Sequence, residues 1–134
     1  MKTLIVDDDL LCREFIKRLL SPYGQCDQAF DGREAIEAFR LALEDVEPYD
    51  LVCLDIMMPH TDGHQALEAM RELESEHGVY GSSGVKVIMT TALSNSKHCI
   101  RAFREGCESY LIKPIKPSVL LERLRELDLL ASSK

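Results

Sequence analysis

Short apolar runs alternate with longer amphipathic segments along this chain. Four of the runs are rich in Val, Ile, Leu or Tyr, and each is short enough to form a β-strand. A fifth run, the second in order, mixes polar and apolar residues, which is typical of a strand at the edge of a sheet. The five runs are Thr3–Val6, Gln25–Phe30, Leu51–Leu54, Val85–Thr91 and Ser109–Ile112.

The segments between these runs carry apolar residues three and four positions apart, which is the spacing of a helix with one buried face. Ser21, Pro22 and Gly24 end the first predicted helix, Gly106 ends the fourth, and Pro117 begins the fifth. The apolar stripes are Leu11, Cys12, Phe15, Ile16, Leu19 and Leu20; Ala35, Ile36, Phe39 and Leu43; Ala66, Leu67, Met70 and Leu73; Cys99, Ile100, Ala102 and Phe103; and Leu120, Leu121, Leu124 and Leu127.

The order of elements is therefore (βα)₅, which predicts an α/β fold with a doubly wound parallel sheet and helices on both faces. Right-handed crossovers favour the flavodoxin-like strand order 2-1-3-4-5. The connector Glu74–Gly84 is rich in Gly and Ser, and we expect it to be a mobile loop.

Composition limits the kinds of protein this chain can be. Its 134 residues fit one domain, for which we predict residues 1–130, followed by a short tail at residues 131–134. The formal net charge of −7 argues against direct nucleic-acid binding. No apolar run reaches the ~20 residues of a membrane-spanning helix, so no membrane insertion is expected.

The five cysteines are Cys12, Cys26, Cys53, Cys99 and Cys107. Their number is odd, none are at CxxC spacing, and each lies in an apolar stretch. Buried free thiols of a cytoplasmic protein are therefore favoured over a disulfide framework or a zinc site.

Polar residues follow the predicted strands where a doubly wound sheet binds its ligands, at the carboxyl ends. Asp7 and Asp8 follow the first strand and Asp55 follows the third, which is its neighbour in the sheet. Clustered carboxylates repel one another unless a cation is present, and oxygen ligands suit Mg²⁺. We also expect Asp8 or Asp9 to cap the helix that begins there.

Four motifs in order make the chain similar to a response regulator receiver domain over nearly its whole length. Any one of them alone is weak, but together at strand ends they are a strong match. They are Leu4-Ile5-Val6-Asp7-Asp8-Asp9; Leu54-Asp55-Ile56-Met57-Met58-Pro59 with Asp62-Gly63; Met89-Thr90-Thr91-Ala92; and Tyr110-Leu111-Ile112-Lys113-Pro114.

The resemblance implies a phosphoprotein of two-component signal transduction or a phosphorelay. Asp55 would accept a phosphoryl group from a sensor histidine kinase or a phosphotransfer protein, as a carboxylate nucleophile. The chain would then be a phosphoacceptor that assists its own phosphorylation and dephosphorylation, and not an enzyme with a separate substrate.

The resemblance also assigns the surrounding roles. Asp8, Asp55 and the backbone carbonyl of Met57 would bind Mg²⁺ (or Mn²⁺), with Asp7 acting through water. The phosphoryl oxygens would be bound by the side chains of Lys113 and Thr91 and by the backbone amide of Ala92.

Three further features concern switching and lifetime. The resemblance implies that Thr91 and Tyr110 move together on phosphorylation, although a half-buried aromatic without a switching role is the simpler alternative. The Lys113–Pro114 peptide bond would be cis. The resemblance also implies that Met57 and Leu93 flank the path of attacking water. Both are apolar and neither can orient a water molecule, which predicts self-dephosphorylation slower than in a chemotaxis-type receiver.

The output of such a domain usually passes through its fourth helix, fifth strand and fifth helix. Charged residues there are candidates for contacts with an unidentified output protein or with a second copy in a homodimer, although a solvated face is the default. They are Arg101, Arg104, Glu122, Arg123 and Glu126. His60 and His64 lack metal-ligand spacing, and we expect them to be loop or surface residues.

Other classes of protein remain open. The chain could be the receiver part of a longer transcription factor or hybrid kinase, although a stand-alone receiver is the leading interpretation. An aspartate-nucleophile phosphatase would need an acid two positions after its nucleophile, where this chain has Met57. A flavodoxin-like electron carrier would place a phosphate-binding loop after its first strand, where Asp7, Asp8 and Asp9 would repel a flavin phosphate.

Overall fold

The computed structural model describes residues 1–80, 83–92 and 96–131, with the backbone alone for residues 96–99. Five parallel strands form one sheet in the order β2-β1-β3-β4-β5, which confirms the predicted α/β fold and strand order. Among the described residues, no helix is both long and apolar enough to cross a bilayer.

The elements follow the predicted alternation closely. The polar–apolar run at Gln25–Phe30 forms the edge strand β2, and its residues are mostly half-buried. In chain order the elements are β1 (Thr3–Val6), α1 (Leu10–Leu20), the 3₁₀ turn Ser21–Tyr23, β2 (Cys26–Ala29), α2 (Gly32–Glu44), β3 (Leu51–Asp55), α3 (Gly63–Glu76), β4 (Lys86–Thr91), α4 (Ser96–Arg104), β5 (Ser109–Ile112) and α5 (Pro117–Glu126).

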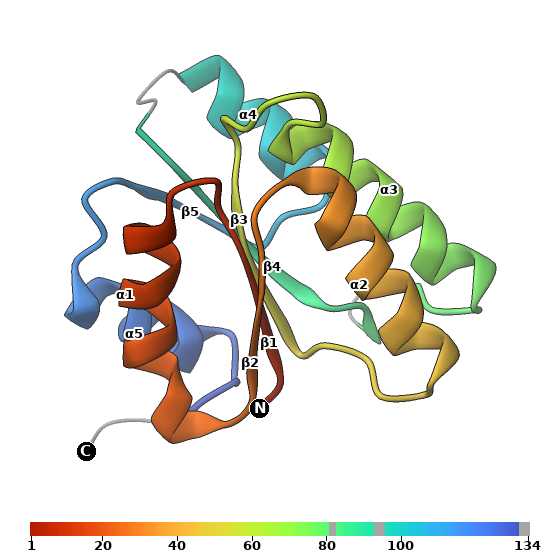
Figure 1. Ribbon diagram of the computed structural model, residues 1–134, viewed down its shortest axis with the longest axis horizontal. Coiled ribbons are helices and arrows are strands. Elements are labelled where there is room, and N and C mark those ends of the chain that lie inside the picture. The colour runs from red at the N-terminus through yellow and green to blue at the C-terminus, as the bar shows by residue number, and fades with distance from the viewer. Residues whose placement is uncertain (81–82, 93–95, 132–134) are drawn as a thin grey trace.

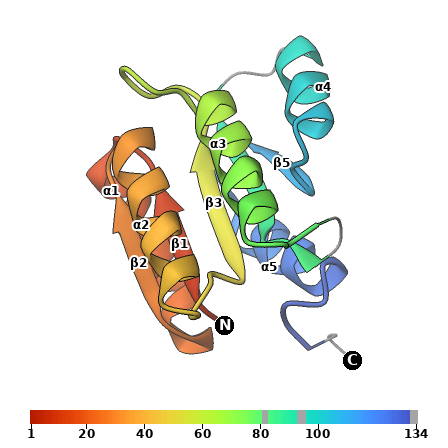
Figure 2. The ribbon, with the colours of Figure 1, turned by 90° about the vertical axis from the view of Figure 1, so that its right-hand side faces the viewer.

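The helices cover both faces of the sheet (Figure 1). Helices α1 and α5 pack on one face, where Ile16, Leu20, Leu120 and Leu124 are buried. Helices α2, α3 and α4 cover the other face, and α2 and α3 lie side by side there (Figure 2). Every residue of β1 and β3 is buried, because these central strands are covered on both faces.

Some apolar stripe residues do not enter the core. Leu11 of α1 is 78% exposed and Phe15 is 41% exposed, whereas Ile16 is buried. Ile100 and Phe103 of α4 are also exposed, by 52% and 48%. In each case the apolar stripe of the helix is wider than the strip that touches the sheet, so part of it faces solvent.

Of the four cysteines whose side chains are described, Cys53 and Cys107 are buried as predicted, whereas Cys12 and Cys26 are only half-buried. Cys12, Cys26 and Cys53 are unpaired thiols. Cys107 is buried, while the side chain of Cys99 is outside the described part. Burial raises the pKa of the Cys53 thiol to about 12, which makes that thiol inert.

The predicted loop Glu74–Gly84 is partly wrong, since α3 continues to Glu76 and the side chain of Glu74 is buried. Residues 81 and 82 of this connector lie outside the described residues. Glu74 is buried because its Oε2 accepts a 2.6 Å hydrogen bond from the Val85 amide, at the start of β4. The carboxylate therefore fixes the end of the connector against α3.

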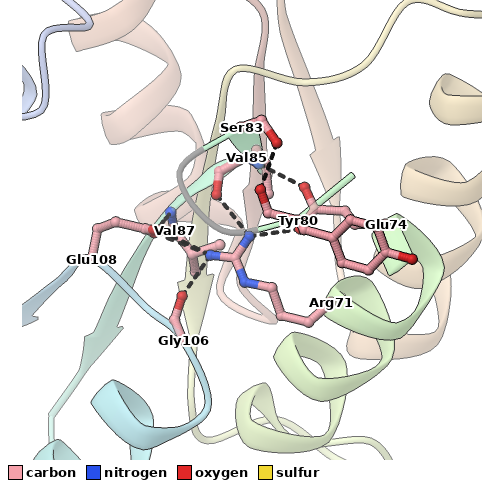
Figure 3. A network of polar contacts seen from close by, with 8 residues as sticks. All are labelled: Arg71, Glu74, Tyr80, Ser83, Val85, Val87, Gly106 and Glu108. Atoms are coloured by element: carbon pink, nitrogen blue, oxygen red, sulfur yellow. Dashed lines mark hydrogen bonds and ion pairs between the residues drawn. The ribbon is translucent and has the colours of Figure 1, made fainter. Parts of the chain in front are cut away.

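Arg71 of α3 joins three segments near the amino end of β4 (Figure 3). Its Nη1 donates to Glu74 Oε1 at 2.8 Å and to the Val85 carbonyl at 2.9 Å. Its Nη2 donates to the Gly106 carbonyl at 2.5 Å and to Glu108 Oε1 at 3.0 Å. One guanidinium group thus connects α3, the start of β4 and the turn between α4 and β5.

The two glycines at this junction allow the close approach of Arg71. Gly106 has φ +99°, a left-handed conformation that favours glycine, and it ends α4 as the sequence predicted. A Cβ on Gly84 would lie 2.8 Å from Glu74 Oε1 and 3.0 Å from Arg71 Nη1. A side chain at Gly84 would therefore displace part of the polar network.

Replacing Arg71 with methionine should lower the free energy of unfolding by about 2–4 kcal/mol, because it leaves a buried carboxylate without its cation. Denaturant unfolding monitored by circular dichroism measures this change. Arg18→Met, at an exposed position of α1, is the matched control and should cost less than about 0.5 kcal/mol. Equal effects of the two substitutions would contradict the structural role of Arg71.

Candidate functional site

Three carboxylates meet at the carboxyl edge of the sheet, where the sequence predicted them. Asp7 follows β1 and Asp55 ends β3, and these strands pair directly. One oxygen from each of Asp7, Asp8 and Asp55 lies within 4.8 Å of the other two. Asp7 and Asp55 are buried, with 1% and 3% exposure, and Asp8 is exposed.

Lys113 supplies the positive charge that faces this cluster. Its Nζ donates to Asp7 Oδ2 at 2.7 Å and lies 3.5 Å from Asp55 Oδ2. The Lys113 amide donates to the Thr91 carbonyl at 2.7 Å, just beyond the end of β5. The Lys113–Pro114 peptide bond is cis, the isomer that the resemblance implies.

Local hydrogen bonds hold the segment after β1. The Asp9 amide donates to Asp7 Oδ1 at 2.9 Å. The Asp9 side chain accepts from the Leu11 amide at 3.0 Å and caps α1. Of the two residues expected to provide this cap, it is therefore Asp9 that does so, which leaves the Asp8 carboxylate beside Asp7 and Asp55.

The ionisation of the site reflects its crowding. Burial, together with the charge of Asp7, raises the pKa of Asp55 to about 6, although Lys113 partly offsets this effect. Burial lowers the pKa of Lys113, but the hydrogen bond to Asp7 and the charges of Asp55 and Asp7 outweigh it and raise that pKa. Burial and a hydrogen bond with Asp7 raise the pKa of the neighbouring Cys12 thiol to about 12. The site therefore favours an added cation.

The donor set fits a hard divalent cation. The three carboxylates offer only oxygen atoms, and among the described side chains the ion pairs with Lys113 leave most of their charge uncompensated. The main chain of Met57 is close to the cluster, because its amide lies 3.4 Å from Asp55 Oδ1. Asp7, Asp8, Asp55 and the Met57 carbonyl are the residues that could hold Mg²⁺.

The remaining predicted residues lie around this edge. Thr91 is fully buried at the end of β4, one position beyond the Asp55–Thr90 pair, and Ala92 is exposed after it. Tyr110 of β5 is half-buried and packs against the core on the face of the sheet that α2, α3 and α4 cover. Leu93 lies outside the described residues.

His64 corrects the expectation that both histidines are loop or surface residues. His60 is an exposed turn residue, but His64 lies in α3 and is 1% exposed. Its Nδ1 is 2.6 Å from Glu105 Oε1, and Arg101 Nε lies 3.3 Å from the same oxygen. His64 is buried because it lies on the side of α3 that faces the end of α4. Its three-residue spacing from Leu67 could have indicated this.

Comparisons with known proteins agree with the fold and identify a family. A family model of the response regulator receiver domain matches residues 3–125. The probable transcriptional regulator ycf27 of Cyanophora paradoxa is 34% identical over 127 residues, covering 94% of this chain and 47% of that protein. The chain spans about half the length of the curated transcriptional regulators it matches.

Other similar proteins have nearly the same length as this chain. The chemotaxis protein CheY of Thermotoga maritima is 28% identical over 127 residues, covering 93% of this chain and 95% of that protein. A solved CheX–CheY–BeF3–Mg²⁺ complex from Borrelia burgdorferi contains a chain with TM-score 0.82 and 25% identity. The match covers 97% of this chain and 90% of that one.

The raised pKa of Asp55 predicts how the stability of the metal-free protein depends on pH. The buried carboxyl favours its protonated form, so its contribution to stability is complete below the unfolded pKa of about 4 and is lost as pH rises through about 6. In chelator, Asp55→Asn should therefore stabilise the protein at pH 7.5, by about 2–3 kcal/mol at ~1.4 kcal/mol per pKa unit.

This gain should shrink towards zero near pH 4 when denaturant unfolding is repeated across the range. The exposed substitution Glu122→Gln removes the same charge and should give no such trend. If the stabilisation by Asp55→Asn were independent of pH, burial and the neighbouring charges would not raise the pKa of Asp55 as predicted.

Proposed function

The chain belongs to the response regulator receiver domain family, and from this premise we propose that it accepts a phosphoryl group on Asp55 in a Mg²⁺-dependent step. The donor would be a phosphohistidine of a sensor histidine kinase or of a phosphotransfer protein. The observation that carries this proposal is the position of Asp55, which is buried beside Asp7, Asp8 and Lys113 at the carboxyl edge of the sheet.

The transfer requires one bond to form and one to break. An Oδ atom of Asp55 attacks the phosphorus while the bond from phosphorus to the donor nitrogen breaks, and the imidazole leaves with the bonding electrons. With a pKa of about 6, Asp55 is mostly ionised at neutral pH and therefore nucleophilic. Bound Mg²⁺, or Mn²⁺, would neutralise charge on the phosphoryl oxygens and on the carboxylates.

The chain's own groups would stabilise the transferred phosphoryl group. Lys113 is already 3.5 Å from Asp55 Oδ2 and would pair with a phosphoryl oxygen. The hydroxyl group of Thr91 and the amide of Ala92 would donate to the others. The chain would act in this way as a phosphoacceptor, without turnover of a separate substrate.

Phosphorylation would change the surface formed by α4, β5 and α5. Movement of Thr91 towards the phosphoryl group would allow the half-buried Tyr110 to turn inward, as the resemblance to receiver domains implies. The exposed side chains of Ile100, Phe103 and Ile112 support a binding role for this surface. Its partner would be a cytoplasmic output protein or a second copy of the chain.

The charged residues of the same surface would set the specificity of that contact. The candidates are Arg101, Arg104, Glu122, Arg123 and Glu126, most of which are exposed. The pair Arg123–Glu126 is 3.5 Å apart and near the surface, so it adds little to stability and remains available to a partner.

One observation supports a second candidate role for the chain, and another argues against a phosphatase. The chain spans about half of several transcriptional regulators, which supports a second candidate, namely the receiver part of a longer regulator. Position 57 holds Met, whose thioether cannot serve as an acid or a base, and this argues against an aspartate-nucleophile phosphatase.

Incubation with Mg²⁺ and a small acyl phosphate should add one phosphoryl group to the protein, detected by intact mass spectrometry. The label should be absent in Asp55→Asn, which lacks the nucleophile, and absent in wild type treated with a chelator. Asp45→Asn, at an exposed position just after α2, should be labelled like wild type. Labelling that survives in Asp55→Asn would refute the assignment of the phosphoacceptor.

Loss of the acyl phosphate should be slow, with a half-life of minutes or longer, because the apolar Met57 and Leu93 cannot orient an attacking water molecule. Met57 is 57% exposed, so Met57→Asn should be tolerated and should shorten the half-life. Leu41→Asn, another exposed apolar position, is the control. A wild-type half-life of seconds would contradict this prediction.

A further inference from the structure

The carbonyl group of Asp7 needs a hydrogen-bond donor from outside the sheet. The last pair of β1 with β2 is Val6 with Ala29, and the Asp7 amide still donates to the Ala29 carbonyl at 3.2 Å. The Asp7 carbonyl itself accepts from Arg13 Nη1 of α1 at 2.7 Å. The Arg13 side chain therefore supplies the donor at the point where the backbone hydrogen bonds between β1 and β2 end.

Arg13 is held in place by Gln28 of β2, which is itself bound to Glu14 of α1. Its Nε donates to Gln28 Oε1 of β2 at 3.0 Å, and Gln28 Nε2 donates to Glu14 Oε1 of α1 at 3.1 Å. Arg13 is half-buried. Because a guanidinium group is planar and its donors are fixed relative to one another, the bond to Gln28 also aims Nη1 at the Asp7 carbonyl.

The bond to the Asp7 carbonyl restrains both acidic residues that follow β1. A peptide group is planar, so fixing the carbonyl of Asp7 also fixes the amide and Cα of Asp8. The Asp9 amide restrains the Asp7 carboxylate from the other side, at 2.9 Å from Oδ1. In the described part of the chain, the hydrogen bonds of Arg13 go to the Asp7 main chain and to Gln28 and not to the clustered carboxylates.

We propose that Arg13 is a positioning residue for the cation site, orienting the Asp7 and Asp8 carboxylates through the peptide group that joins them. This inference rests on the proposed function, because it concerns the same oxygen cluster. Arg13 is not a cation ligand. Groups that orient metal ligands from behind typically change metal affinity roughly 10–100-fold when removed.

A purely structural role for Arg13, tying α1 to the sheet, makes a different prediction. Loss of that tie would lower the stability of the metal-free protein but would leave cation affinity unchanged in the folded fraction. Affinity for Mg²⁺, measured apart from stability, separates the two roles.

The experiment titrates Mg²⁺ into wild type, Arg13→Met and Arg18→Met by isothermal calorimetry, and measures unfolding of each protein in chelator. Methionine keeps the apolar stem of Arg13 but removes every donor. We expect the Kd for Mg²⁺ to rise roughly tenfold in Arg13→Met, at the lower end of the range for such groups. Arg18→Met, on the exposed side of the same helix, should stay within about twofold of wild type.

Phosphorylation by the acyl phosphate provides an independent readout. The rate of Arg13→Met should fall at low Mg²⁺ and recover towards wild type at saturating Mg²⁺, because only the binding of the cation is weakened. Gln28→Met keeps the guanidinium group of Arg13 but removes the side chain that holds it in place. It should therefore also raise the Kd for Mg²⁺, by a smaller factor than Arg13→Met. This variant replaces Arg13→Met in the titration if the latter does not fold.

The outcomes distinguish this inference from the proposed function. An unchanged Kd for Mg²⁺ in folded Arg13→Met, or in Gln28→Met where that variant is needed, overturns the positioning role while wild type is still labelled on Asp55. An equal rise in Arg18→Met also overturns it, because the effect would then be one of net charge. Wild type that neither binds Mg²⁺ nor is labelled would overturn both proposals.

Discussion

Three carboxylates share one edge of the sheet with Lys113, and the imbalance of charge among these described groups is the constraint on which the site depends. Asp7 and Asp55 are buried there, and Lys113 reaches both at 2.7 and 3.5 Å. Burial and mutual repulsion raise the pKa of Asp55 to about 6. Such a cluster would favour the binding of a cation, and Asp55 would remain mostly ionised at neutral pH. The crowding of buried carboxylates thus explains both the electrostatic cost of the site and the proposed reactivity of Asp55.

The charges are arranged differently at the two ends of the strands. At the amino end of β4, Arg71 donates to the carboxylates of Glu74 and Glu108 (Figure 3). The charge of Lys86 also acts on Glu108, so two positive charges face two carboxylates there. At the carboxyl edge the charge is left unbalanced. Stability is therefore concentrated away from the site, as expected where a functional cluster costs folding energy.

Much of the fold and part of the site could be predicted from the sequence. The residues at strand ends converge because parallel strands in the order 2-1-3-4-5 bring their carboxyl ends to one edge. The roles of Arg71 and His64 could not be predicted in this way. Their acidic partners, Glu108 and Glu105, lie 37 and 41 positions away in the chain. No local pattern encodes such a pair.

The sequence by itself determined which segments are strands and helices, because hydrophobic period and turn residues are local properties. It also determined that acidic residues follow β1 and β3. Only the tertiary structure decided which side of each apolar stripe is buried, as for Ile16 against Leu11. It likewise decided that Asp9 caps α1 while Arg13 holds the carbonyl of Asp7. These choices depend on distances between elements, which are set only when the helices pack on the sheet.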